Sequence, residues 1–220
     1  MLNSLEAILF DLDGVIVDSR APVARCINFA LERAGLAPER EHLLHARIGD
    51  PLHGVFVALL ADRGADAARA PACVAAYREL YREVSLTETS LVPGMGELLE
   101  ALAARRPLAL ATSKPLEFAV PILERLGVAG HFAAHVGAPL VAGPPESKTG
   151  TARRALAALG LGPGGRAALV GDRHHDVSAA RTLAIGAIGV TWGIGSEAEL
   201  REAGAEWLVT SPGELGRLLA

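Results

Sequence analysis

Residues 7 to 14 read Ala-Ile-Leu-Phe-Asp-Leu-Asp-Gly, an apolar run that ends in two aspartates and a glycine. A short, wholly apolar run is typical of a strand buried inside a parallel sheet. Asp11 and Asp13 are two positions apart, so in an extended segment both carboxylates point to the same side, and Gly14 allows a sharp turn directly afterwards. Ligands of open parallel sheets bind at the carboxyl ends of strands, where this pair stands.

From Pro107 onward the chain alternates between short apolar runs and amphipathic stretches. The runs predict strands at 108–111, 167–170 and 187–191, and the stretches predict helices at 115–126, 176–183 and from near Ser196. Ser196 with Glu199, and Ser211 with Glu214, fit the capping box that begins a helix. This alternation of strands and helices predicts an α/β fold, a doubly wound parallel sheet with helices on both faces.

Residues 18 to 84 show helical periodicity instead, with apolar side chains at Val23, Ile27, Ala30 and Leu31. We therefore expect a small helical cap domain at 16–90, inserted into a core formed by 1–15 and 91–220. Val92-Pro93-Gly94 marks the return to the core.

The bulk properties predict a cytoplasmic protein with no nucleic-acid or membrane partner. The formal charge is -4 with no basic block, no apolar stretch reaches the roughly 18 to 20 residues that span a bilayer, and the N-terminus does not read as a signal peptide. Cys26 and Cys73 form no paired motif and are interpreted as reduced packing residues. The oligomeric state, monomer or homodimer, stays open.

Lysine is rare in this chain. Lys114 and Lys148 stand against nineteen arginines, and each lies beside a segment that resembles a phosphate site. A compact ammonium suits places where a planar guanidinium does not fit. At 111–115 the chain reads Ala-Thr-Ser-Lys-Pro, and the hydroxyls of Thr112 and Ser113 precede a predicted helix start, a favourable position for phosphate oxygens.

Two pairs of aspartates supply complementary chemistry. An aspartate such as Asp11 can attack a phosphoryl group, and a second carboxyl such as Asp13 can protonate the leaving oxygen and later deprotonate water. Asp172 and Asp176 are one helical turn apart and can present oxygens to Mg²⁺. His174 and His175 are interpreted as exposed residues at a helix start rather than metal ligands.

The segment Phe-Asp-Leu-Asp-Gly-Val, with Asp18-Ser19 beyond it, resembles the first motif of the haloacid dehalogenase superfamily. The other three motifs appear in order, so the resemblance covers essentially the whole chain and implies the Rossmann-like core of that superfamily. It implies that Asp11 and Asp172 bind Mg²⁺ by side chain, Asp13 by its carbonyl, and Asp176 from close behind. It also implies that Thr112 holds the phosphoryl group and that Lys148 neutralises the charge of the phosphoryl group and of the nucleophile together. Lys148 follows a predicted loop that contains Gly143-Pro144-Pro145. Lys114 is a further candidate for substrate binding.

The motifs also separate the chemistries of the superfamily. Hydrolytic dehalogenases lack the second aspartate, and phosphonate-cleaving members need a cap lysine that residues 15 to 90 do not contain. The remaining expectation is a phosphatase that acts on a small phosphorylated metabolite through an aspartyl phosphate and resembles the phosphoglycolate phosphatase group. A nucleoside 5'-monophosphatase and a sugar-phosphate phosphatase or mutase are the alternatives within the superfamily. A receiver-like domain and a catalytically silent phosphate-binding protein are the alternatives outside enzymes.

The cap is expected to close over the site and to influence the choice of substrate. The candidates for contact with an anionic leaving group are Arg20, Arg47 and His53. Ile48-Gly49-Asp50-Pro51-Leu52 resembles the cap loop of the phosphoglycolate phosphatase group, but Asp50 replaces a more usual proline. The physiological ester is therefore left open.

Overall fold

The computed structural model describes residues 4–139 and 146–220 and divides into two compact units. Unit 1 comprises the chain up to Asp18 and from Ser90 onward, and unit 2 comprises Ser19–Thr89. In the described part of the chain, no helix has the length and apolar character needed to cross a bilayer.

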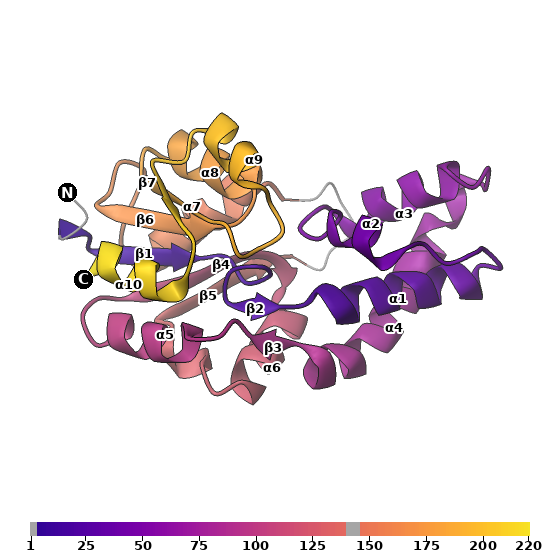
Figure 1. Cartoon of the computed structure of the whole chain (residues 1–220), viewed down its shortest axis with the longest axis horizontal. Helices are drawn as coiled ribbons and strands as arrows, with labels where there is room; N and C mark the ends of the chain where they lie inside the picture. Colours follow the sequence, from indigo (N-terminus) through magenta and orange to yellow (C-terminus); the bar gives the residue numbers. More distant parts are fainter. Residues whose placement is uncertain (1–3, 140–145) are drawn as a thin grey trace. The chain divides into compact units, whose positions relative to one another are not determined.

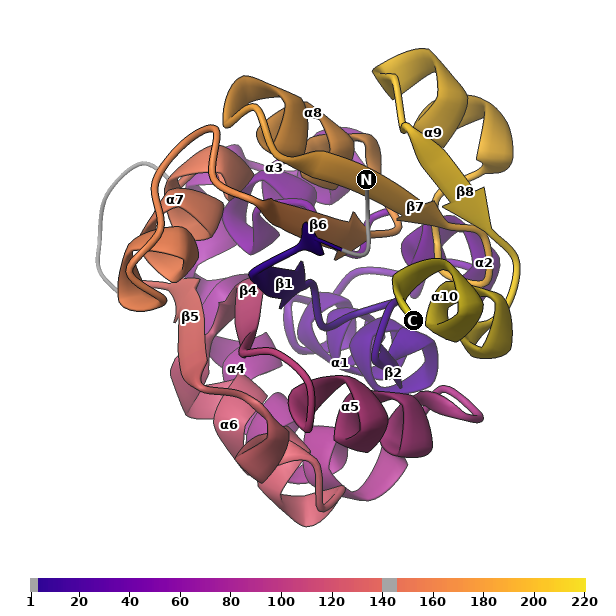
Figure 2. The same ribbon diagram turned by 90° about the vertical axis from the view of Figure 1, so that its left-hand side faces the viewer.

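A parallel sheet of six strands forms the centre of unit 1 among the residues described, in the order β5-β4-β1-β6-β7-β8 (Figure 2). The strands are β1 (Ala7–Phe10), β4 (Leu108–Pro115), β5 (Ala134–Ala138), β6 (Ala167–Gly171), β7 (Gly186–Val190) and β8 (Trp207–Val209). After β1 the chain builds the sheet outward on one side through β4 and β5, and then on the other side through β6, β7 and β8. Ligand sites of such sheets lie at this change of direction.

The register of β1 aligns the ends of the three central strands. Phe10 pairs with Leu110 of β4 and with Val170 of β6. Because these strands are parallel, Asp11, Thr112 and Asp172 all follow at the same edge of the sheet.

Helices cover both faces of the sheet, which confirms the doubly wound α/β prediction. Figure 2 shows α7, α8 and α9 on one face and α5, α6 and α10 on the other. Leu156, Val177 and Leu200 pack with Leu9 in one buried cluster on the first face. The helices are α5 (Met95–Ala103), α6 (Leu116–Arg125), α7 (Lys148–Ala158), α8 (His174–Thr182), α9 (Glu197–Ala203) and α10 (Pro212–Leu219), with a 3₁₀ turn η3 (Ala129–His131).

Unit 2 is built of helices (Figure 1). They are α1 (Arg20–Arg33), α2 (Glu41–His45), α3 (Leu52–Ala61) and α4 (Ala70–Glu88), with a 3₁₀ turn η2 (Ala67–Arg69). The predicted apolar positions of α1 are buried, and Tyr77 stacks on Tyr81 with ring centroids 5.0 Å apart. Cys26 and Cys73 are free and buried, as predicted.

Several boundaries differ from the predictions. β4 continues to Pro115, which pairs with Ala138 after an irregularity in the register, so α6 begins at Leu116 rather than Pro115. α8 begins at His174, because Asp176 caps it by accepting a hydrogen bond from the Arg173 amide at 3.1 Å. Four strands were not predicted from the sequence: β5, β8 and a short antiparallel pair, β2 (Val17–Asp18) with β3 (Ser90–Leu91).

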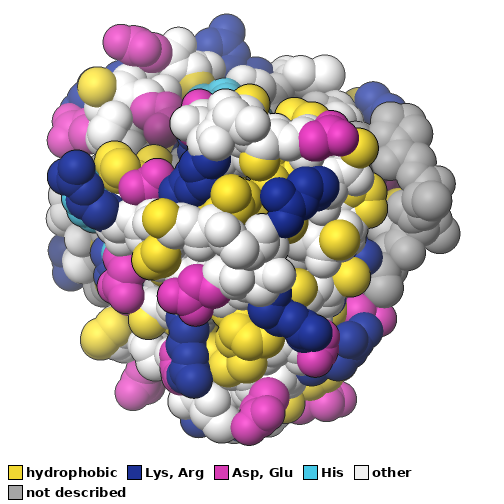
Figure 3. Space-filling model, turned by 90° about the vertical axis from the view of Figure 1, so that its right-hand side faces the viewer, with side chains coloured by type: hydrophobic (Ala, Val, Ile, Leu, Met, Phe, Trp, Pro, Cys, Tyr) yellow, Lys and Arg dark blue, Asp and Glu magenta, His cyan; other side chains and the backbone are white. Residues whose placement is uncertain are grey.

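Figure 3 shows that positive and negative side chains are interspersed on the face turned to the viewer. The described part of that face has no area of a single charge.

Candidate active site at the carboxyl edge of the sheet

The loop after β1 carries the two aspartates that the sequence singled out. Gly14 adopts a φ of 77°, and its amide donates to the Val17 carbonyl at 2.9 Å, so the chain reverses directly after Asp13. An L-residue rarely adopts this conformation. The turn leaves Asp11 and Asp13 half-buried at the end of the central strand.

Lys148 contacts both Asp11, the candidate nucleophile, and Asp176 in α8, the helix that follows β6. It is the first residue of α7, whose N-cap Ser147 accepts a hydrogen bond from the Gly150 amide. Its Nζ lies 2.7 Å from Asp11 Oδ1 and 2.7 Å from Asp176 Oδ1, and its side chain is 5% exposed. These anionic partners offset the cost of placing a buried cation at the positive end of a helix.

Asp172 is buried and only half satisfied by hydrogen bonds. Its Oδ2 accepts from the Ile194 amide at 2.7 Å, whereas its Oδ1 is buried without a hydrogen-bond partner. Carboxylate oxygens of Asp11, Asp172 and Asp176 lie within 4.8 Å of one another. A buried unpaired carboxylate oxygen is costly, so this one is directed at a place where a cation would stabilise it.

The backbone at Gly14 and at Gly193 packs closely against the Asp172 side chain. A Cβ atom at Gly14 would lie 2.1 Å from Asp172 Oδ2, and one at Gly193 would lie 2.4 Å from the same atom. Both positions therefore require glycine for packing, and the carboxylate is held in one place.

The electrostatics of the cluster favour an additional cation. The pKa of Asp11 is raised to about 6, chiefly by burial, with the Lys148 ammonium opposing the rise and the Asp176 carboxylate adding to it. The pKa of Asp172 is raised well above its usual range by burial and then by the carboxylates of Asp176 and Asp11. Burial alone would lower the pKa of Lys148, but Asp11 and Asp176 raise it above its usual value. The positive charge of Lys148 therefore does not fully compensate the negative charge of the ionised carboxylates.

The donor set fits Mg²⁺, which prefers a few carboxylate oxygens together with water and substrate phosphate. Among the described residues at this edge, the carboxyl groups of Asp11, Asp13, Asp172 and Asp176 outnumber the ammonium groups of Lys114 and Lys148 by two. A divalent cation would balance the two excess charges.

Thr112, Ser113 and Lys114 lie near the carboxyl end of β4, at the same edge of the sheet. Thr112 is buried, and its Oγ1 accepts a hydrogen bond from the Lys114 amide at 3.1 Å, while Ser113 is exposed. Lys114 Nζ lies 2.6 Å from Asp13 Oδ1, in a pair whose side chains are 9% and 13% exposed. The sequence indicated Lys114 as a candidate for substrate binding but gave no reason to pair it with Asp13.

The remaining candidates belong to unit 2 or to the start of α8. Arg20 and His53 are exposed and Arg47 is half-buried, and all three belong to unit 2, so their contact with substrate stays a prediction. His174 and His175 begin α8, as predicted, but only His175 is exposed. His174 is half-buried, because its amide and ring nitrogen both contact Glu199 Oε1. The predicted loop at 143–145 falls outside the described residues.

The segment after β7 is the part of the site that sequence reasoning missed. Ile194 donates to Asp172, and Trp192 Nε1 donates to the Val15 carbonyl at 3.1 Å. Two glycines, Gly193 and Gly195, flank Ile194 directly after a predicted strand. Glycines in this position indicate that another group lies close to the backbone, but they do not indicate which residue it is.

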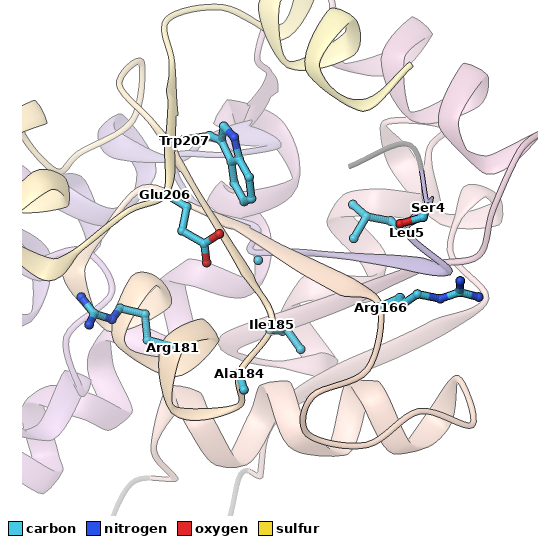
Figure 4. Close-up of a pocket in the computed structure, with 9 residues that line it drawn as sticks. Ser4, Leu5, Arg166, Arg181, Ala184, Ile185, Glu206 and Trp207 are labelled. Atoms are coloured by element: carbon cyan, nitrogen blue, oxygen red, sulfur yellow. The ribbon is translucent and has the colours of Figure 1, made fainter. Parts of the chain in front are cut away.

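A hollow of about 510 Å³ lies at the opposite edge of the sheet, by the amino ends of β6, β7 and β8. Figure 4 shows the indole of Trp207 and the carboxylate of Glu206 at this hollow, with the guanidinium groups of Arg166 and Arg181 at its two ends. The charged groups do not converge on one point, and no predicted site residue lines it.

Known proteins resemble this chain in sequence and fold. The family described as haloacid dehalogenase-like hydrolase matches residues 5–183. A 5'-nucleotidase of Pseudomonas aeruginosa is 40% identical over 88% of this chain and 86% of its own length. A phosphoglycolate phosphatase of Chromobacterium violaceum is 33% identical over 99% of this chain and 98% of its own. The crystal structure of a predicted phosphatase from Clostridium acetobutylicum superposes with a TM-score of 0.87 at 32% identity, covering 97% of each chain. With the four motifs gathered at one sheet edge, the chain belongs to the haloacid dehalogenase-like hydrolase family.

Proposed function

We propose that this protein is a Mg²⁺-dependent phosphatase that hydrolyses a small phosphate monoester through an aspartyl phosphate on Asp11. The observation that carries the proposal is the cluster of Asp11, Lys148, Asp172 and Asp176 beside a second acid, Asp13. Relatives named as phosphatases and as a nucleotidase support the same class of reaction.

In the first step, a carboxylate oxygen of Asp11 attacks phosphorus and the bond to the ester oxygen breaks. Asp13 gives a proton to that oxygen, so the alcohol leaves neutral. Thr112, Ser113 and Lys148 hold the phosphoryl oxygens, and Lys148 also keeps Asp11 in position through its 2.7 Å contact.

In the second step, water attacks the phosphorus of the aspartyl phosphate and gives a proton to Asp13. The bond between phosphorus and Asp11 breaks, inorganic phosphate leaves, and both carboxyl groups return to their starting state. Asp13 thus acts first as an acid and then as a base.

The side chains of Asp11 and Asp172 and the carbonyl of Asp13 would hold Mg²⁺, with Asp176 close behind. The ion would neutralise the negative charge shared by the nucleophile and the phosphoryl group. Asp176 positions Lys148 through their contact of 2.7 Å.

The test is the rate of phosphate release from alkyl and aryl phosphates by the protein and by Asp11→Asn. We expect turnover that a chelator abolishes and Mg²⁺ restores, and a loss of at least about 10³ in the variant, because the covalent route is removed. Circular dichroism and the melting temperature check that the variant is folded. Near-normal turnover by folded Asp11→Asn, or full activity in excess chelator, would refute the mechanism.

A nucleoside 5'-monophosphatase is the second candidate, because the relative from Pseudomonas aeruginosa carries the name 5'-nucleotidase. A panel of nucleoside monophosphates, sugar phosphates and hydroxy-acid phosphates, compared by kcat/KM, separates the candidates. A catalytically silent relative would turn over none of them.

A further inference from the structure

Glu199, in the first turn of α9, is directed at the start of the neighbouring helix α8. A glutamate three residues after a serine N-cap commonly turns back to cap its own helix. Here its Oε1 accepts from the His174 amide at 2.9 Å and from Arg173 Nε at 2.9 Å. The His174 ring nitrogen Nδ1 lies 2.7 Å from the same oxygen. One carboxylate oxygen therefore holds the backbone and the side chains of two consecutive residues.

Glu199 is an anion in this contact. Burial favours its neutral form, but the hydrogen bonds from His174 and Arg173 outweigh burial and lower the pKa of Glu199 to about 2. Hydrogen bonds between a guanidinium and a carboxylate are roughly twice as strong as those between neutral groups. The side chains of Arg173 and Glu199 are 13% and 26% exposed, so water competes with the contact only in part.

The two residues that Glu199 holds belong to the acidic cluster's own turn. The turn between Asp172 and Asp176 begins with them. The Arg173 amide donates to Asp176 Oδ2 at 3.1 Å, and the other oxygen of Asp176 contacts Lys148. A displacement of the backbone at Arg173 would therefore move Asp176 and, through it, Lys148.

Asp172 is held by the segment that leads into α9. The Ile194 amide donates to Asp172 Oδ2 at 2.7 Å, and a Cβ atom at Gly195 would overlap the Asp172 carbonyl oxygen. Glu199 follows only four residues after Gly195. The chain from Ile194 to Glu199 thus contacts the turn first at Asp172 and then at the two residues that follow it.

A metal centre depends on groups that hold its ligands in place. Removing such a supporting partner typically weakens metal binding or activity by about 10- to 100-fold. The contacts of Glu199 described above are with the residues between Asp172 and Asp176, so its influence on these two carboxylates passes through the turn.

We propose that Glu199 is a positioning residue for the metal centre, which holds the turn between Asp172 and Asp176 so that both carboxylates face one cation. The inference rests on the metal site of the proposed function. It adds a residue from outside the four motifs, on an element that follows the last of them.

The experiment measures metal binding without a phosphate ester. Mn²⁺ accepts the same kinds of oxygen ligand as Mg²⁺, and the electron paramagnetic resonance signal of the free ion falls as it binds. For Glu199→Ala we expect the Kd for Mn²⁺ to rise by about 10- to 100-fold. Glu199→Gln keeps the size and one acceptor oxygen but loses the charge, so its Kd should rise less. Glu202→Ala and Glu202→Gln, at an exposed position of the same helix, are the matched controls and should follow wild type.

Kinetics separate positioning from a general loss of structure. With p-nitrophenyl phosphate, Glu199→Ala should need about 10- to 100-fold more Mg²⁺ for half-maximal rate. Saturating Mg²⁺ should return kcat to within about tenfold of wild type and leave KM for the ester unchanged, because the defect lies in metal binding. A general loss of structure would instead lower the rate at every Mg²⁺ concentration.

Three results would overturn the proposal. They are an unchanged Kd for Mn²⁺ in folded Glu199→Ala, an equal rise in the Glu202 variants, and a loss of rate that saturating Mg²⁺ does not relieve. Circular dichroism and the melting temperature check folding. If the alanine variant does not fold, Glu199→Gln decides: a Kd equal to that of wild type would refute the role of the charge.

The proposed function can fail separately. Binding of Mn²⁺ that weakens in Asp172→Asn and in Glu199→Ala, without hydrolysis of any ester, would support the positioning role and refute the phosphatase. Hydrolysis that needs Mg²⁺ but is the same in Glu199→Ala would refute the positioning role alone. If the wild-type protein binds no Mn²⁺, the inference falls together with the metal site.

Discussion

Asp13 and Asp11 are separated by a single residue, yet they meet different surroundings. Asp11 contacts Lys148 within the acidic cluster, and Asp13 contacts Lys114. We expect Asp13→Asn to lower the rate on alkyl phosphates by about 10² to 10⁴, and to lower it less for activated aryl phosphates, whose leaving groups need no proton. Rates for a series of leaving groups measure the difference. The same loss for every leaving group would remove Asp13 from the role of general acid.

Asp172, which we propose as a Mg²⁺ ligand, is a buried carboxyl group whose ionisation is costly in the metal-free protein. Its pKa is raised in the folded state, so its favourable contribution to stability is present below the unfolded pKa and is lost as pH rises through the folded pKa. In Asp172→Asn that loss is absent. The melting temperature of the metal-free variant, compared with that of the wild type, should therefore increase as the pH rises above roughly 4, the ordinary pKa of aspartate.

The same variant should need at least about tenfold more Mg²⁺ for half-maximal activity. Asp62→Asn, at an exposed position of unit 2, is the control and should follow wild type in both measurements. A melting difference for Asp172→Asn that does not change with pH, or an unchanged need for Mg²⁺, would contradict this account.

Asp11 and Asp172 could be predicted as candidates because each is an acid directly after an apolar run, and Lys148 because lysine is rare in this chain. The structure places Lys148 Nζ 2.7 Å from Asp11 Oδ1, and carboxylate oxygens of Asp11 and Asp172 within 4.8 Å of each other. The pairing of Lys114 with Asp13 could not be predicted, because it joins residues 101 positions apart and depends on where a flexible side chain comes to rest.

At the scale of elements, the loops after β1 and β7 hold Asp172 by backbone packing. Gly14→Ala should destabilise the protein by at least about 1 kcal/mol more than Gly160→Ala. Both glycines have positive φ, of 77° and 74°, but a Cβ at Gly14 would meet Asp172 whereas one at Gly160 has nothing within 4 Å. Denaturant unfolding of both variants measures the difference, and equal losses would show that backbone strain alone acts at Gly14.

Secondary structure was predictable where a pattern is local. The apolar run of β1, the serine caps at Ser196 and Ser211, and the apolar stripe of α1 all follow from neighbouring residues. β5 and β8 were missed because Ala134–Ala138 and Trp207–Val209 are short and gain their stability from pairing with β4 and β7. The extension of β4 to Pro115 likewise depends on Ala138, a partner distant in sequence.

At the scale of the whole molecule, the family resemblance leads us to expect that unit 2 takes part in choosing the ester. We expect Arg47→Ala to change the ratio of kcat/KM between hydroxy-acid, sugar and nucleoside phosphates. The rate on p-nitrophenyl phosphate should stay within about tenfold, because a small aryl ester draws little binding energy from remote groups. Loss of all turnover in a folded variant that still binds Mg²⁺ would mean that unit 2 supplies a catalytic group.

The rarity of lysine has a practical consequence for handling this protein. Both lysine side chains lie in the candidate active site, 9% and 5% exposed, while the other basic side chains are guanidinium and imidazole groups. Amine-reactive dyes, cross-linkers and coupling resins will therefore find almost no side-chain amine on the surface, and their main target will be the α-amino group. A reagent that does acylate a lysine reports that the active site has been reached, so protection by phosphate gives a direct measure of its occupancy.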